Sequence, residues 1–102
     1  MTASLLILYP HPANPAQFDK AYREEHLPLA STELTGVVGV TTHPVLGTPG
    51  GKAPYHLVTE VKFSSLDALQ TCAASAGGQK TIAHAQKLST GGPALFLITN
   101  GS

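Results

Sequence analysis

The sequence predicts an α+β fold in which strands and helical regions follow one another in the order βαββαβ. Aliphatic runs lie near both ends of the chain, and two further strand-like segments lie near its middle. A helical pattern of apolar residues follows the first aliphatic run, and another follows the second of the two middle segments. Glycine and proline residues separate these segments. This order predicts a ferredoxin-like sandwich with a four-stranded antiparallel sheet.

Length and composition limit the class of protein. The chain has 102 residues, which is the length of one ordinary domain, so we expect residues 1–102 to form a single domain. Charged residues make up 12% of the chain, against about 25% in a typical globular protein, and hydrophobic residues 42%, which predicts compact folding. Six Lys and Arg balance six Asp and Glu, so no basic surplus is available to neutralise phosphates. Nucleic acid and anionic membranes are therefore not expected partners.

The first predicted strand is the run SLLILY at residues 4–9. Pro10 and Pro12 close it, because proline lacks the amide hydrogen that a sheet ladder needs. A short run that is apolar at both parities is typical of a strand buried on both faces.

The first helix is predicted to begin after Asn14 and Pro15, which suit a cap and a first helical residue, and to reach about His26. Pro28 disfavours a helical conformation in Leu27 before it. We therefore expect the helix to break or kink immediately after His26 and to resume as a short turn. The predicted inner arc, with His26 at its edge, consists of Phe18, Ala21, Tyr22, Glu25 and Leu29.

The middle of the chain predicts an antiparallel hairpin. Residues 37–45 and 55–63 have the pattern of strands, and the segment between them is rich in glycine and proline. Ser64 or Ser65, with Asp67 nearby, is typical of a helix start.

The last third of the chain predicts a second helical region and a fourth strand. The helical stripe weakens around Gly77 and Gly78, so we expect a separate helical piece over residues 79–88. The final strand is predicted at residues 94–99, the run ALFLIT.

The sheet face opposite the helices is expected to be covered by a second copy of the chain. Residues 5–8 and 95–98 are apolar at both parities, whereas a face in contact with water would alternate toward polar residues. Burial of apolar surface stabilises by about 25 cal/mol per Å², so an uncovered face would forgo several kcal/mol. We therefore expect a homodimer that pairs sheet to sheet as a dimeric α+β barrel.

The first third of the chain resembles the EthD family, whose members are small proteins of the dimeric α+β barrel superfamily. The resemblance is densest over residues 5–30 and is carried by Tyr9-Pro10, Phe18-Asp19, Tyr22, His26 and Pro28-Leu29. It implies a ligand cleft between helices and sheet, a polar group in that cleft at His26, and no cofactor. EthD proteins are associated with ether degradation, and similar proteins act on polyketide-type aromatic rings as decarboxylases, dehydratases or cofactor-free oxygenases. This chain departs from the family's pattern over residues 77–93, which are rich in Gly, Ala and Thr.

His26 is the candidate acid or base, because an ionisable group beside an apolar cleft is typical of a functional site. A histidine that only caps the end of the helix is the alternative. Glu25 could pair with a polar group across the cleft or reach the solvated rim. Phe18 and Tyr22 could form an aromatic wall for a flat ligand or belong to the core. The hydroxyl of Tyr9 could reach a ligand or cap a loop.

Two further histidines are candidate substrate-binding residues. His56 is predicted to share one strand face with Val58 and Glu60, because alternate residues of a strand point the same way. His43 joins that neighbourhood only if the hairpin register allows, since a slip of one residue reverses its facing.

The remaining chemistry of the sequence is sparse. The five histidines show no spacing typical of a metal site, so no metal is expected. Cys72 is the single cysteine and is expected to be a small core residue in a protein of a reducing compartment. No run is long enough to span a bilayer and no secretory signal is evident, so we expect a cytoplasmic protein.

These observations predict a small-molecule protein whose ligand is hydrophobic, aromatic or polyketide-like, with His26 as acid or base. A cofactor-free monooxygenase of the same superfamily is one alternative. A noncatalytic dimeric binding or accessory protein in a degradation pathway is the other.

Overall fold

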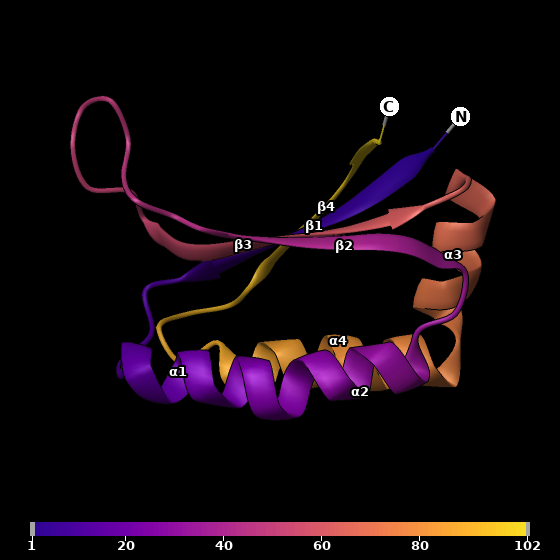
Figure 1. Ribbon diagram of the computed structural model, residues 1–102, viewed down its shortest axis with the longest axis horizontal. Coiled ribbons are helices and arrows are strands. Elements are labelled where there is room, and N and C mark those ends of the chain that lie inside the picture. Colours follow the sequence, from indigo (N-terminus) through magenta and orange to yellow (C-terminus); the bar gives the residue numbers. More distant parts are fainter. Residues whose placement is uncertain (1, 102) are drawn as a thin grey trace.

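The computed structural model describes residues 2–101, and in it helices cover one face of a four-stranded antiparallel sheet (Figure 1). The strand order β2-β3-β1-β4 is that of a ferredoxin-like fold, as predicted. The elements in chain order are β1 (Ala3–Pro10), α1 (Pro15–Ala21), the π-helical turn η1 (Tyr22–His26), α2 (Leu27–Glu33), β2 (Val37–Pro44), β3 (Tyr55–Phe63), α3 (Leu66–Ala74), α4 (Ala76–Leu88) and β4 (Leu95–Asn100).

The central strand β1 pairs with β3 on one side and with β4 on the other. Its inner residues meet the helices, and the neighbouring strands take up its backbone hydrogen bonds on both sides. Ile7, Tyr9, Leu57 and Phe63 are buried on the inner face. The predicted β2–β3 hairpin is confirmed, with its connecting segment projecting from the body (Figure 1).

The prediction that the first helix breaks or kinks immediately after His26 is wrong about a break. Leu27 has a right-handed helical backbone, with φ −60° and ψ −44°, so α1, η1 and α2 form one continuous helical segment. The Leu27 amide donates to the Tyr22 carbonyl, five residues back. A π-helical turn of this kind widens the helix directly before Pro28, which cannot donate a hydrogen bond of its own.

The π-helical turn also decides which side chains face the sheet. Phe18, Tyr22 and His26 are buried, whereas Glu25 is exposed. In a regular α-helix, residues four apart drift by about 40° around the axis. The π-helical turn rotates less per residue and offsets this drift, so His26 lies under Tyr22. Glu25, which a regular helix would place on the inner arc, is turned away from it.

Ser75 joins the two C-terminal helices. It follows α3, and its hydroxyl caps α4 by accepting from the Gly78 amide at 2.9 Å. α4 therefore begins at Ala76, three residues before the predicted residue 79. Gly78 is required there, because a Cβ on it would run into the Cys72 carbonyl. The predicted cap at Ser65 is confirmed, with its hydroxyl 3.1 Å from the Ala68 amide.

The helices α1, α2 and α4 lie beneath the sheet and α3 stands at one end of it, so the opposite face of the sheet is left open (Figure 1). Leu95 and Leu97 lie on this open face, and each is 42% exposed. Ser4 and Glu60 also lie there and are joined by a hydrogen bond of 2.8 Å. The second copy expected against this face stays a prediction.

Candidate functional site

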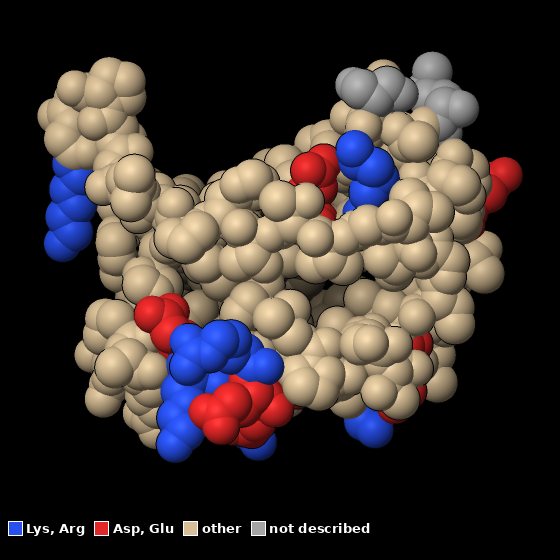
Figure 2. Space-filling view, viewed as in Figure 1, with Lys and Arg blue, Asp and Glu red and all other residues tan. Residues whose placement is uncertain are grey.

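A cavity of about 430 Å³ lies between the inner face of the sheet and the helices. In Figure 2 the surface is hollowed between these two layers, and the rim of the hollow is mostly uncharged. Small residues on the helices leave this room, since large side chains at Ala30, Ala73 and Ala85 would fill it. Most of the lining is aliphatic or aromatic, and the polar side chains in it are those of Tyr22, His26, Ser31, Thr59 and Thr81.

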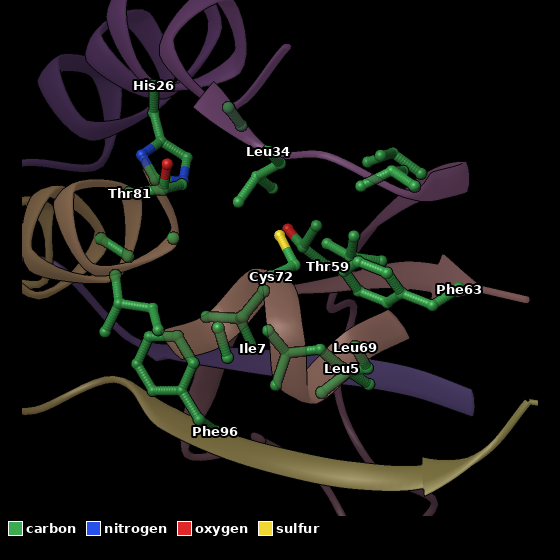
Figure 3. Close-up of a pocket in the computed structure, with 18 of the residues that line it drawn as sticks. Leu5, Ile7, His26, Leu34, Thr59, Phe63, Leu69, Cys72, Thr81 and Phe96 are labelled. Atoms are coloured by element: carbon green, nitrogen blue, oxygen red, sulfur yellow. The ribbon is translucent and has the colours of Figure 1, made fainter. Parts of the chain in front are cut away.

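His26 is the one ionisable histidine in this lining. Figure 3 shows its side chain projecting from the helix into the cavity. The residue is only 5% exposed, and burial together with the neighbouring His84 lowers its pKa from 6.5 to about 4, burial being the larger cause. The imidazole is therefore neutral at pH 7.

The two nitrogens of His26 have different surroundings. Nδ1 lies 2.9 Å from Nδ1 of His84, and the two rings are nearly parallel, at an angle of 7°. Nε2 forms no hydrogen bond with any of residues 2–101. It is the nitrogen that remains for a ligand.

Tyr22 fixes the wall beside His26. Its ring stacks on that of His26 at 5.6 Å between centroids, and its hydroxyl lies 2.6 Å from the hydroxyl of Thr59 and 3.0 Å from that of Thr42. Two strands thus hold one hydroxyl, which leaves the ring little freedom to move.

Tyr9 and Phe18 form the core behind this wall. The Tyr9 ring meets the Phe18 ring edge to face at 5.2 Å and the Tyr22 ring at 5.9 Å. Neither Tyr9 nor Phe18 lines the cavity. The Tyr9 hydroxyl is fully buried without a hydrogen-bond partner among residues 2–101, and burial, followed by the effect of Tyr22, raises its pKa.

Glu25, His43 and His56 also lie outside the cavity. Glu25 lines a separate outer hollow between α1 and α4. His43 is exposed on the open sheet face, opposite Val58 in the β2–β3 register.

His56 does not share a face with Val58 and Glu60, which corrects the expected strand pattern. The register shifts where Tyr9 pairs with Leu57 and Pro10 with Tyr55, so His56 lies in a β-bulge. The bulge directs its side chain toward α1, where Nε2 lies 2.8 Å from the Asp19 carboxylate.

Sequence reasoning missed His84 as a partner of His26. The two histidines are 58 residues apart, so no spacing within one helix connects them. It also missed Thr59 as a partner of the Tyr22 hydroxyl, because a buried threonine in a strand has no signature of its own.

The family model for the EthD domain matches residues 10–88. The chain belongs to the EthD family. The 430 Å³ cavity of this EthD protein lies between the helices and the sheet, where the sequence resemblance implies a cleft. A search of curated proteins finds no match.

Solved structures share the fold of this EthD chain. An EthD family protein from Bacillus halodurans c-125 is 24% identical over 100% of both chains, with a TM-score of 0.89. A dimeric ferredoxin-like protein of unknown function from Jannaschia sp. CCS1 is 15% identical, covering 98% of this chain and 99% of that one, with a TM-score of 0.71. SnoaB, a cofactor-independent oxygenase from Streptomyces nogalater, is 15% identical, covering 99% and 92%, with a TM-score of 0.64.

Within residues 2–101 there is no helix with the length and apolarity needed to cross a membrane. The same residues contain no group of three or more His, Cys, Asp or Glu side chains that could hold a metal ion.

Proposed function

We propose that this EthD protein binds a flat hydrophobic molecule, aromatic or polyketide-like, in the cavity, and that His26 acts on it as a general base or acid. The observation that carries the proposal is a neutral, buried imidazole with one unpartnered nitrogen in the wall of an apolar cavity. A volume of about 430 Å³ falls within the range of small-molecule sites, and a few polar groups in an apolar lining are typical of them.

The reaction class follows from the protonation state. A neutral imidazole can take a proton from an activated C–H or from a hydroxyl, and the electron pair then stays on the ligand as an enolate or phenolate. The imidazolium that forms can return a proton to another atom of the ligand. Proton transfer of this kind is the common step of isomerisation, dehydration and decarboxylation of activated rings.

A homodimer is part of the proposal. Leu95 and Leu97 on the open sheet face support pairing with a second copy, since large apolar residues gathered on one face favour association. The Jannaschia protein of the same fold is described as dimeric, which agrees with this arrangement. A role in ether degradation and a cytoplasmic location stay predictions.

Cofactor-independent oxygenation is the alternative that the fold of SnoaB suggests. The same base would begin it, because removal of a proton from an activated methylene gives a carbanion that can react with O₂. Noncatalytic binding is the other alternative, in which the cavity holds a molecule without changing it.

Anthrone is a suitable probe, because it is flat and tricyclic and has an activated methylene. Exchange of the methylene hydrogens in D₂O reports the base. We expect wild-type protein to accelerate exchange, and His26→Gln to lower the rate by about 100-fold while keeping the fold. Lys20→Gln, a change on the exposed side of α1, is the matched control and should exchange as wild type.

The outcomes separate the alternatives. O₂ consumption with formation of anthraquinone and water would favour the oxygenase. Binding without exchange would favour a carrier. Equal exchange by wild type and His26→Gln would contradict the role of His26.

A further inference from the structure

We infer that His84 is a positioning residue that relays protons between His26 and solvent, so that the buried cavity exchanges protons through the helix pair and not through its own mouth. This inference rests on the proposed acid–base role of His26. It identifies a second functional residue, on α4, and an exit for the proton.

Two separate hollows carry the inference. His26, and not His84, lines the apolar cavity. His84, and not His26, lines an outer hollow of about 240 Å³ between α1 and α4. The pair of Nδ1 atoms, 2.9 Å apart, is the contact that joins the two hollows.

The contact itself requires an ordered arrangement of protons. A hydrogen bond between two Nδ1 atoms needs a proton on one ring and a lone pair on the other. If His26 holds the Nδ1 proton, its Nε2 is free to accept a proton from a ligand. His84 then accepts at Nδ1 and has its own proton on Nε2.

One transfer through the pair balances without any further reactant. The ligand gives a proton to Nε2 of His26, the Nδ1 proton of His26 moves to Nδ1 of His84, and Nε2 of His84 gives its proton to water. Both rings end neutral, each in its other tautomer, and the ligand keeps the electron pair. The reverse sequence delivers a proton to the ligand.

The surroundings of His26 make such a relay useful. Burial lowers its pKa to about 4, so it holds an added proton poorly in the apolar cavity. His84 is half-buried, and a charge on it is better hydrated than one on His26. Transfer of the proton from His26 to His84 therefore favours removal of a proton from the ligand by His26.

The groups around the pair are compatible with passage of a proton. Tyr22 stacks on the cavity side of His26 and its hydroxyl is held by two threonines, so it does not compete for the histidine nitrogens. Glu25 of η1 and Lys87 of α4 are the charged groups that line the outer hollow with His84. Both side chains are exposed, so bulk water reaches this hollow and can take the proton.

The arrangement of protons is tested first in the protein without ligand. In ¹⁵N-histidine NMR we expect one ring of the pair as the Nδ1–H tautomer, the other as the Nε2–H tautomer, and a scalar coupling between the two Nδ1 nuclei. Two rings of the same Nε2–H tautomer would overturn the inference.

The relay is then tested with anthrone exchange in His84→Phe, a variant that keeps an aromatic ring at this position but removes the nitrogens. We expect anthrone to bind as in wild type and the exchange to slow by about tenfold or more. Added imidazole should restore part of the rate in His84→Ala, where the missing ring leaves room for it beside His26, and should not do so in His84→Phe. Lys20→Gln again serves as the control.

Failure of the relay and failure of the proposed function give different results. Exchange in His84→Phe at the wild-type rate, with His26→Gln inactive, would overturn the relay alone. A slowed rate in His84→Ala that imidazole does not restore would mean that His84 only holds His26 in place, and would also overturn the relay. Exchange by His26→Gln at the wild-type rate would remove the acid–base role on which the relay depends.

Discussion

His26 and His84 belong to different helices, 58 residues apart in sequence, and meet through Nδ1 atoms 2.9 Å apart with nearly parallel rings. The first ring borders the apolar cavity and the second borders the outer hollow. An ionisable pair thus crosses the helix layer at a point where the rest of the cavity wall is mostly apolar.

The stability of the protein should depend on pH through His26. Its pKa is about 4 in the folded protein and near 6.5 when unfolded, so between these values the unfolded chain binds more protons. Stability is therefore full above pH 6.5 and falls as the pH is lowered toward 4, by about 3 kcal/mol at 1.36 kcal/mol per pKa unit. Denaturant unfolding at a series of pH values measures this.

His26→Gln is the control for that titration, because it removes the titrating ring. The free energy of unfolding of wild type should fall relative to that of the variant by about 3 kcal/mol as the pH is lowered from 6.5 to 4. A difference in the free energy of unfolding between wild type and variant that is the same at every pH would show that folding does not lower the pKa of His26.

The hydroxyls of Tyr9 and Tyr22 should affect the free energy of unfolding with opposite signs. The Tyr9 hydroxyl is buried without a hydrogen-bond partner in the described part of the chain, so Tyr9→Phe should raise the free energy of unfolding by about 1 kcal/mol. Tyr22→Phe removes two hydrogen bonds and leaves a buried threonine hydroxyl without its partner, so it should lower that free energy by about 1–2 kcal/mol. Urea unfolding of both variants measures the difference, and equal losses in the two would contradict the assignment.

The open sheet face should mediate dimerisation. Leu97→Lys places a charge on this face and should convert a dimer to a monomer, as measured by native mass spectrometry. Leu66→Lys on α3 is a matched control, because Leu66 is 47% exposed and Leu97 is 42% exposed. A wild-type monomer, or a Leu97→Lys dimer as stable as the wild type, would show that this face is covered in some other way.

Filling the cavity should block binding without loss of the fold. Ala30→Leu adds volume from α2 into the cavity, and we expect the affinity for anthrone to fall by about tenfold with a change in stability of less than about 1.5 kcal/mol. Ala16→Leu on the exposed side of α1 is the matched control. Isothermal titration calorimetry with both variants measures the affinity for anthrone. An undiminished affinity in Ala30→Leu would show that the ligand binds outside the cavity.

Local signals predicted most of the fold. The order of the elements along the chain, the hairpin, and the caps at Asn14 and Ser65 depend on residues close together in sequence. The continuous first helix was not predictable in the same way, because Pro28 ordinarily ends a helix and only the wider π-helical turn accommodates it. The same turn decides that His26 faces the cavity and Glu25 does not.

Long-range contacts account for the rest of the candidate site. The helix pattern places Tyr22 on the inner arc, the family resemblance places His26 in the cleft, and both residues line the cavity. The bulge at His56 depends on how β1 pairs with β3, and the contact of His26 with His84 depends on how two helices pack. Neither follows from a repeat of residue types along the chain.

The central claim is that a ligand lies in the cavity against His26, and isotope-filtered NOE spectroscopy with anthrone and labelled protein tests it most directly. We expect NOEs from anthrone protons to Hε1 of His26 and to the methyl groups of Ile7 and Val61, which line the same cavity. NOEs confined to Leu95 and Leu97 on the open sheet face, or no NOE at saturating anthrone, would contradict the claim.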